Sequence, residues 1–597
     1  MRLGLKTWLG ITLAVFGLLL VPVYWARYDL VGWWVLPREG IRPAEQRVCA
    51  EPNVAMTTSD ETVLRADIYR PCSQGKAPTI LVRIPFSRGW KNELGSGAIA
   101  RFWAARGYNV VVQGTRGRFK SDGKFYPLRH ERQDGIETLA WLARQPWFDG
   151  RFGMWGGSAF GHTQWAIADQ TNPRPLAFAI QIASTSFREM FHQGGAFALE
   201  SALFWAVRSH GPSDVWPDQR ALERGFNGWP LIEADDRAVN NIPFFNDWVL
   251  HADADAYWLA VDGEDRAKSL QAPVLLMAGW YDPFLPTQLR DFETIRREAT
   301  PHVAKKSRLI IGPWTHAGEV RFPDGRTGPE YRPASVGPSL SWFDHHLLGR
   351  PLEGRLAAPV LIYVMGENKW RAEQEWPLAR AKETALYLTG SRTETAPLKD
   401  RRLTFGRPTD REPPRTFTYD PLNPVPTRGG AMLGNRAGIY EQEDVETRAD
   451  VLVFTSDPLT EALEVSGPVR AVLYVATSAP STDFTVKLVD VHPNGKAYNV
   501  TDGILRRTYH QSEAAVPTEI AVELNPTSML FRKGHSIRVE ISSSNYPRFD
   551  RNPNTGRGIA RETNPVRATQ TVFLGADTAS RIILPVVSLT AGGQATR

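Results

Sequence analysis

Short apolar runs alternate with helical stretches along the first part of the chain. Apolar, β-branched runs predict strands at Thr79–Phe86, Tyr108–Gln113, Phe152–Trp155, Leu176–Ala183, Val274–Ala278 and Arg308–Ile311. Helices are expected at Gly97–Arg106, at Asp134–Arg144 and from Ser158 onward. This alternation is typical of an α/β fold, in which helices cover both faces of a parallel sheet.

The strand pattern stops between residues 188 and 268, where aromatic residues gather. Most of them are expected to be core residues of a helical cap inserted into the sheet domain: Phe191, Phe197, Phe204, Trp205, Trp216, Phe226, Trp229, Phe244, Phe245, Trp248 and Trp258. The α/β core is therefore expected in two parts, residues 45–187 and 269–355, on either side of this cap.

The pattern changes again after Gly349. Short strands are expected at Ala385–Leu388, Leu452–Thr455, Ala471–Thr477, Thr485–Val489, Ile520–Leu524, Ser536–Ser542 and Thr571–Leu574. Few helical periods separate them, so residues 356–597 are expected to form an all-β domain, a sandwich or jelly roll.

The N-terminal segment has the pattern of a membrane anchor. An uncharged run of 20 residues, Thr7 to Ala26, follows Arg2 and Lys6. As a helix it would be about 30 Å long, enough to span a bilayer. We interpret residues 1–36 as a signal anchor with a transmembrane helix, which places the body of the protein in the periplasm or outside the cell. A cleaved signal peptide, giving a secreted protein, is the alternative.

The two cysteines agree with export. Strands at Asn53–Met56 and Val63–Tyr69, joined by a turn near Asp60, would place Cys49 opposite Cys72 and within reach of a disulfide. Such a bond forms in oxidising compartments. Two free thiols are the alternative, because a slip of one residue would break the pairing.

Composition and charge exclude several classes of protein. The chain has 597 residues, 42% of them hydrophobic and 22% charged, which argues against wholesale disorder. Its net charge of +6 comes from scattered residues without a dense basic block, so no nucleic-acid partner is expected. The adjacent His345 and His346 lack a recognised ligand spacing, and neither a metal nor another cofactor is expected.

The segment GGSAFG at residues 156–161 is a candidate nucleophile turn. It ends a predicted strand and begins a helix, so Ser158 would stand on a tight turn with Gly156 and Gly161 leaving room around it. The helix N-terminus favours negative charge that develops near its amides. A serine among glycines can also be an ordinary turn, and it is the strand–turn–helix context that favours a nucleophile.

A matching acid and base follow in the order that such hydrolases use. Asp282 comes just after the strand that begins at Val274, and His316 comes just after the next strand. Ligand sites form at the carboxyl ends of parallel strands. We therefore expect Ser158 to attack a carbonyl carbon, His316 to accept and return the proton, and Asp282 to orient the imidazole.

These motifs resemble those of the CocE/NonD serine hydrolases, the cocaine-esterase-like and X-Pro dipeptidyl-peptidase-like family. The resemblance covers about residues 50–590. Its segments are TRGRFKSDG at 115–123, GGSAFG at 156–161, GWYD at 279–282, GPWTH at 312–316, STDF at 481–484 and DRNPNTG at 550–556. It implies an α/β-hydrolase domain, a helical cap and a C-terminal jelly roll.

The oxyanion site departs from this family. The family places a tyrosine after a proline at the end of the first core strand, and its hydroxyl donates to the oxyanion; here the pair is Pro85-Phe86. The loss of one such donor typically costs about 10²–10³ in rate. The backbone amides of Ala159 and Phe86 are the remaining candidate donors.

The leading hypothesis is a serine hydrolase that cleaves carboxylic esters through an acyl-enzyme. The apolar segment Pro283–Pro286 follows Asp282 where related ester hydrolases of α-amino acids carry acidic residues, so an apolar substrate group is expected. The acidic residues Glu233, Asp235 and Asp236 of the cap are expected on a solvated face. An amide hydrolase or X-Pro dipeptidyl-peptidase is one alternative. A non-catalytic binding protein with a degenerate oxyanion site is another.

Overall fold

The computed structural model describes residues 36, 41–73, 75–87, 90–211, 216–263, 265–316, 318–352, 354–390, 401–509 and 516–588. Apart from Leu36, the expected signal anchor at residues 1–36 lies outside these ranges. Within them, no helix is long and apolar enough to cross a membrane.

The described part of the chain contains a ten-stranded sheet in the order β1-β2-β4-β3-β5-β6-β9-β10-β11-β12. The strands are β1 (Val48–Thr57), β2 (Val63–Pro71), β3 (Ala77–Ile84), β4 (Asn109–Gly114), β5 (Phe148–Gly157), β6 (Ala177–Gln181), β9 (Val274–Tyr281), β10 (Arg308–Thr315), β11 (Val360–Val364) and β12 (Lys369–Glu373). The strands from β4 to β11 run parallel, and β1, β2 and β12 pair antiparallel at the two edges. The α/β core predicted from the sequence is therefore present.

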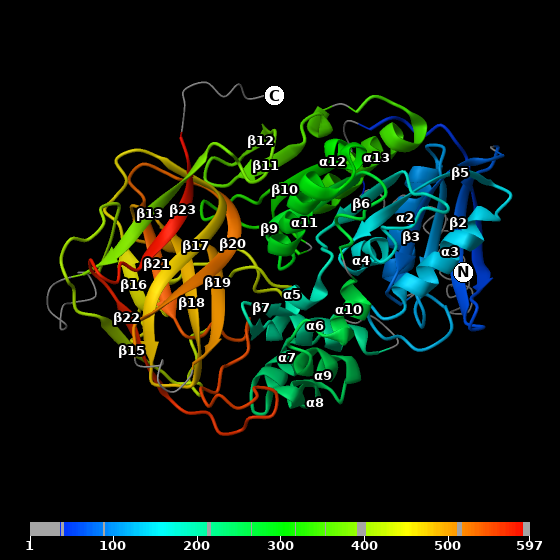
Figure 1. Ribbon diagram of the computed structural model, residues 1–597. Helices are drawn as coiled ribbons and strands as arrows, with labels where there is room; N and C mark the ends of the chain where they lie inside the picture. The colour runs from blue at the N-terminus through cyan, green and yellow to red at the C-terminus, as the bar shows by residue number, and fades with distance from the viewer. Residues whose placement is uncertain are drawn as a thin grey trace, which may run out of the picture.

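Helices cover both faces of this sheet (Figure 1). Side chains alternate along a strand, so Leu81 of β3 packs with one group of helices while Ile80 and Val82 pack with the other. The first group is α3 (Glu131–Ala143), α4 (Ala159–Trp165) and α11 (Leu285–Glu298), and α12 (Pro301–Lys306) adds Val303 to the same core. The second group is α2 (Trp90–Ala104) and α13 (Tyr331–Leu348).

A helical cap lies between β6 and β9, as expected for residues 188–268. Its elements are α5 (Phe187–Phe191), β7 (His192–Gln193), β8 (Ala196–Phe197), α6 (Leu199–Ser209), α7 (Gln219–Phe226), η1 (Leu231–Glu233), α8 (Ala234–Ala238), α9 (Pro243–Leu250) and α10 (Ala256–Asp262). The aromatic side chains form its core: the rings of Trp205 and Trp248 stack with centroids 5.1 Å apart, and Phe191 stacks on Trp248 at 4.5 Å.

A second, β-rich domain follows. Its described strands are β13 (Ala381–Thr389), β14 (Arg402–Thr404), β15 (Arg415–Tyr419), β16 (Leu452–Thr455), β17 (Leu463–Thr477), β18 (Ser481–Val491), β19 (Ala497–Thr508), β20 (Thr518–Phe531), β21 (Ser536–Ser542), β22 (Ala568–Phe573) and β23 (Arg581–Val587). They pair almost entirely antiparallel and enclose their own apolar core. The short α14 (Glu443–Glu446) and η2 (Gly354–Leu356) lie outside the two sheets.

The boundary between the two sheets differs from the expected one at residue 355. β11 and β12 fall inside the segment 356–597 that was assigned to the all-β domain, yet β11 pairs in parallel with β10 of the first sheet. The two strands are separated by a short turn, which resembles the hairpin spacing of the β domain. The sheet therefore changes between Glu373 and Ala381.

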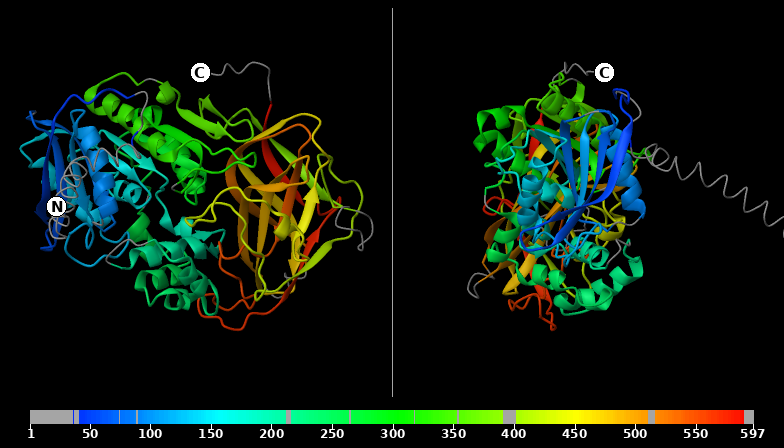
Figure 2. Two further views of the ribbon diagram at one scale, coloured as in Figure 1. Left: turned by 180° about the vertical axis from the view of Figure 1, so that it is seen from behind. Right: turned by 90° about the vertical axis from the view of Figure 1, so that its right-hand side faces the viewer.

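The cap joins the two domains (Figure 2). In Figure 1 and in the left panel of Figure 2, the cap helices lie beside the end of the β domain and against the α/β sheet domain. One of the links is the small β7–β8 hairpin, where the Arg506 backbone N–H donates to Gly194 O at 2.7 Å. The Phe197 N–H donates to Asp550 Oδ1 at 2.8 Å. Arg506 in turn bonds Asp483 and Asp550, so one buried guanidinium holds together strands and loop at this contact.

The β1–β2 hairpin carries a disulfide between Cys49 and Cys72, with Cα atoms 5.0 Å apart. The expected register is wrong, although the bond is present. A bulge between Glu51 and Val54 shifts the pairing, so Cys49 lies opposite Arg70 and Cys72 lies just beyond the strand end. The two cysteines therefore meet diagonally.

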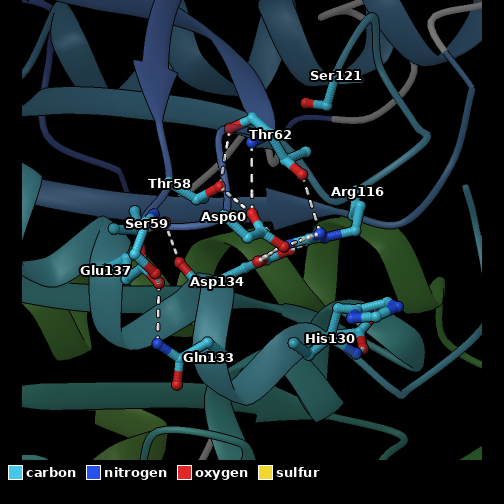
Figure 3. Close-up of polar contacts among 12 residues, drawn as sticks. Thr58, Ser59, Asp60, Thr62, Arg116, Ser121, His130, Gln133, Asp134 and Glu137 are labelled. Carbon is cyan, nitrogen blue, oxygen red and sulfur yellow. Dashed lines mark hydrogen bonds and ion pairs between the residues drawn. The ribbon is translucent and has the colours of Figure 1, made fainter. Parts of the chain in front are cut away.

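Arg116 of the segment 115–123 ties the turn of this hairpin to α3, as Figure 3 shows. Arg116 lies between two carboxylates: it donates to Asp60 in the hairpin turn and to Asp134 of α3, with shortest distances of 2.6 and 2.7 Å. The hydroxyl of Ser121 accepts from the Arg65 backbone N–H at 2.9 Å. These contacts give the TRGRFKSDG motif a structural role.

Candidate active site

Ser158 stands on a tight turn between β5 and α4. Its backbone has φ 56° and ψ −128°, a conformation that is costly for a residue other than glycine. Two glycines make the turn possible: a Cβ on Gly156 would lie 2.4 Å from Phe160 Cβ, and one on Gly161 would lie 2.5 Å from Ala183 Cβ. The Ser158 N–H donates to Gln181 O of β6 at 2.9 Å, which fixes the turn to the sheet.

The three predicted side chains meet at the carboxyl ends of their strands. Ser158 Oγ lies 2.8 Å from His316 Nε2, and His316 Nδ1 lies 2.6 Å from Asp282 Oδ2. Because a carboxylate can only accept, His316 carries its proton on Nδ1, and Nε2 accepts from the Ser158 hydroxyl. This arrangement can move a proton from the serine to the histidine as the serine attacks.

The carboxylate of Asp282 is held in place by the chain around it. Its side chain is fully buried, whereas that of His316 is 14% exposed. The second oxygen, Oδ1, accepts from the Phe284 N–H at 2.8 Å. The acid is therefore rigid, and the imidazole stays open toward the serine.

The candidate oxyanion site lies at the start of α4. Ala159 is the first residue of that helix, so its N–H has no acceptor within the helix. Phe86 lies next to it, because the Phe86 ring packs against the Phe160 ring with centroids 5.4 Å apart. The Phe86 side chain therefore lies beside the helix that follows Ser158. The role of the Ala159 and Phe86 amides as oxyanion donors stays a prediction.

Arg208 was not among the residues predicted from the sequence. This residue of α6 places its guanidinium carbon 5.0 Å from the Phe86 ring centroid. The cap therefore contributes a cation beside the oxyanion region. Cap and core are far apart along the chain at this point, and a lone arginine in a helix has no distinguishing pattern.

The surroundings of His316 are aromatic. The Phe284 ring lies 5.7 Å from the imidazole, and Phe187 packs against Phe284 at 5.0 Å. Phe187 also contacts His162, which belongs to α4 and is fully buried. Burial lowers the pKa of His162 to about 3, so this imidazole is neutral and serves as a packing residue.

Fold and site together define an α/β-hydrolase carrying a helical cap and a second, β-rich domain. A family described as X-Pro dipeptidyl-peptidase (S15 family) matches residues 60–318. The X-Pro dipeptidyl-peptidase C-terminal non-catalytic domain matches residues 355–583. The first match covers most of the α/β sheet domain with its cap, and the second covers nearly all of the β-rich domain together with β11 and β12 of the first sheet.

Individual relatives agree. The chain is 33% identical over 578 residues to cocaine esterase from Rhodococcus sp. (strain MB1 Bresler), covering 90% of this chain and 98% of that protein. An aminopeptidase structure from Thaumarchaeota archaeon superposes with a TM-score of 0.76 at 22% identity, covering 92% and 98%. An α-amino acid ester hydrolase structure gives 0.74 at 21% identity over the same shares. The chain belongs to the family of serine hydrolases that includes cocaine esterase and the S15 peptidases.

Proposed function

We propose that this protein is a serine esterase in which Ser158, His316 and Asp282 form the catalytic triad. The unbroken chain of hydrogen bonds from Ser158 Oγ through the imidazole to Asp282 carries the proposal. Ser158 attacks the ester carbonyl, and His316 takes its proton and passes one to the departing alcohol. Water then hydrolyses the acyl-enzyme with His316 as the base.

The negative oxygen of the tetrahedral intermediate would be bound by backbone amides. The N–H of Ala159 at the start of α4 is one donor, and the N–H of Phe86 is the second. The positive end of the helix dipole adds to their effect.

The substrate is expected to present an apolar group next to the ester. Phe284, which follows the catalytic acid, and Phe187 form an aromatic wall beside His316. The acidic residues of the cap do not provide an evident ammonium site. Glu233 and Asp236 are exposed as expected, but Asp235 is buried, contrary to expectation, because its carboxylate accepts from the Ile242 N–H.

Hydrolysis of amides or X-Pro peptides is the second candidate, and the S15 family match favours it. A panel of p-nitrophenyl esters and X-Pro anilides separates the two. We expect cleavage of the esters with short and medium acyl chains. Cleavage of the anilides alone would replace the esterase proposal by the peptidase one.

We also propose that the body of the protein works outside the cytoplasm, anchored by the N-terminal segment or secreted after its cleavage. The disulfide between Cys49 and Cys72 supports this, because such bonds persist in oxidising compartments. Membrane fractionation of cells expressing the full chain tests the anchor. Recovery of all the protein in the cytoplasm, with both thiols reactive to maleimide, would contradict it.

Labelling by a fluorophosphonate probe tests the triad. Ser158→Ala should abolish labelling, and His316→Ala should lower ester turnover by about 10⁴-fold, because the nucleophile then lacks its base. The control is His345→Ala, a histidine outside the proposed triad whose Nδ1 lies 2.8 Å from Arg350 O and whose ring packs against His346. Unchanged turnover in folded Ser158→Ala would exclude the proposed nucleophile.

A further inference from the structure

A second cluster of chemically active side chains belongs to the β domain. It lies where that domain faces the α/β sheet. Asp490 belongs to β18, His492 follows that strand directly, and His535 precedes β21. The catalytic residues belong to the other domain and take no part in the cluster.

Strand pairing explains how the three side chains come together. Asp490 pairs with Ile537 and Val491 with Ser536 in the antiparallel β18–β21 ladder. Continuing this register by one residue brings His492 opposite His535. Residues two apart on a strand share a face of the sheet, so Asp490 lies on the same face as His492.

The potential ligand atoms are as close as a metal ion requires. His535 Nδ1 lies 2.9 Å from Asp490 Oδ1, and His492 Nε2 lies 3.3 Å from Asp490 Oδ2. One potential ligand atom from each of the three residues lies within 4.8 Å of those of the other two. In a tetrahedral zinc site with bonds of about 2.0–2.1 Å, ligand atoms are about 3.3 Å apart. Small side-chain rotations would therefore suffice to bind an ion.

The cluster also borders a cavity. All three residues line a space of about 210 Å³ that is also lined by Tyr281 of β9 and by Met365, which follows β11. Asp490 is only 2% exposed, whereas the two histidine side chains are partly open. An ion bound to the three residues would thus have protein on one side and room for water on the other.

We propose that Asp490, His492 and His535 bind a divalent first-row transition-metal ion, with Zn²⁺ as the best fit. Two imidazoles and one carboxylate form a donor set typical of such ions. Ca²⁺ and Mg²⁺ prefer oxygen ligands and are expected to bind poorly. Sequence patterns do not reveal this site, because His535 lies next to a different strand and the Asp-x-His pair alone is an ordinary strand end.

The competing interpretation is that the three side chains are hydrogen-bonded to one another and bind no metal ion. In it, each imidazole simply donates one N–H to the buried carboxylate. The charged groups facing the cavity do not decide between the two: Asp324 and Arg532 both line it, and the Arg532 guanidinium already donates to Gly366 O at 2.6 Å.

Metal binding to the intact protein separates these interpretations. After treatment with a chelator and its removal, the protein is dialysed against Zn²⁺, and bound metal is counted by mass spectrometry. We expect about one Zn²⁺ per chain, a higher Tm with Zn²⁺ and no comparable rise with Ca²⁺. In the Co²⁺-loaded protein, the visible absorption spectrum of the bound ion reports directly on the ligands that surround it.

Variants then locate the ion. His492→Gln and His535→Gln should each lose the bound ion and the zinc-dependent rise in Tm while keeping the circular dichroism spectrum. His345→Gln is the matched control and should retain both. His316→Ala should also retain both, which excludes adventitious binding at the proposed active site.

Two results would overturn the proposal. One is the absence of stoichiometric Zn²⁺ and of Co²⁺ absorption in the unsubstituted protein. The other is unchanged metal content in folded His492→Gln and His535→Gln. Both readouts are independent of ester turnover, so they stand whether or not the triad acts as proposed.

Discussion

At the scale of single residues, the replacement of a tyrosine by Phe86 is the feature that most affects the expected rate. The ring contacts both Phe160 of α4 and the Arg208 guanidinium, so its position is well defined. If the amides of Ala159 and Phe86 bind the oxyanion as proposed, a hydroxyl on this ring would add a donor near them.

Phe86→Tyr is therefore expected to raise kcat for p-nitrophenyl esters. One oxyanion donor is worth about 10²–10³ in rate, and a gain of at least tenfold with little change in KM is expected. Phe86→Leu, which removes the ring without adding a donor, is the control. An unchanged kcat in Phe86→Tyr would mean that the hydroxyl does not reach the oxyanion.

Another residue, Asp291, gives the protein a pH-dependent stability. It is buried on α11, where its carboxylate accepts from the Thr185 hydroxyl at 2.6 Å and from the Thr185 N–H at 2.9 Å. Burial raises its pKa to about 7, although the bonds from Thr185 oppose the shift. The stability that comes from this raised pKa is complete below about pH 4 and is lost as the pH rises through 7.

Asp291→Asn should remove this dependence. Between pH 5 and pH 8 the free energy of unfolding of the variant should gain about 2–3 kcal/mol relative to the parent, at about 1.4 kcal/mol for each pKa unit. Urea unfolding at the two pH values measures the difference. An equal change in both proteins would show that Asp291 titrates normally.

The sequence is informative about single residues only where the chain supplies a local pattern. Ser158, Asp282 and His316 each follow a predicted strand, and the structure brings the three together. Arg208 and the Asp490 cluster depend on contacts between distant segments. No local pattern identifies those residues.

At the scale of elements, the nucleophile turn depends on the absence of side chains. Gly161 lets α4 pass close to the end of β6, since a Cβ there would lie 2.5 Å from Ala183. Gly95 of α2 offers the opposite case, because a Cβ at that position meets nothing within 4 Å.

Gly161→Ala and Gly95→Ala should consequently have opposite effects. Gly161→Ala should lower both Tm and kcat, because α4 must move and take Ser158 with it. Gly95→Ala should raise stability by about 0.5–1 kcal/mol, the usual gain from replacing a helical glycine by alanine. Thermal unfolding and ester turnover of both variants provide the test. Full activity in Gly161→Ala would contradict the tight packing.

Most elements were predictable in position, and their pairing was less so. Six strands of the parallel sheet, β3, β4, β5, β6, β9 and β10, and the helices α3 and α4 lie close to where the sequence predicts them. The parallel strand β11 was not predicted, and α2 begins at Trp90, well before the predicted Gly97. The bulge between Glu51 and Val54 could not be predicted, since it depends on cross-strand contacts, and it changed the register around Cys49. β11 and β12 were not predicted and fall within the segment that was assigned to the β domain, because a short strand carries no mark of its partner.

At the scale of the whole molecule, one buried charge cluster links cap and β domain. The Arg506 guanidinium bonds Asp483 at 2.7 Å and Asp550 at 2.9 Å, and Asp550 also accepts from the Phe197 N–H of the cap. All three charged side chains are almost fully buried.

Arg506→Met should destabilise the protein strongly. It leaves two carboxylates buried without their cation, a change that typically costs about 3–5 kcal/mol. Arg411→Met is the matched control: its ion pair with Asp577 is exposed, and an effect of at most about 1 kcal/mol is expected. Equal effects in urea unfolding would show that the buried cluster adds no stability.

The edges of the ten-stranded sheet have a consequence for solubility. An open strand edge can recruit the strand of another chain and start aggregation. Here β1, at one edge, contains Pro52 and a bulge, and β12, at the other, carries Lys369 and Arg371. Proline, bulges and charges each oppose such pairing, so the hydrophobic parallel strands between them are shielded from self-association. A protein that crosses a membrane unfolded and refolds among its own copies would need this protection most.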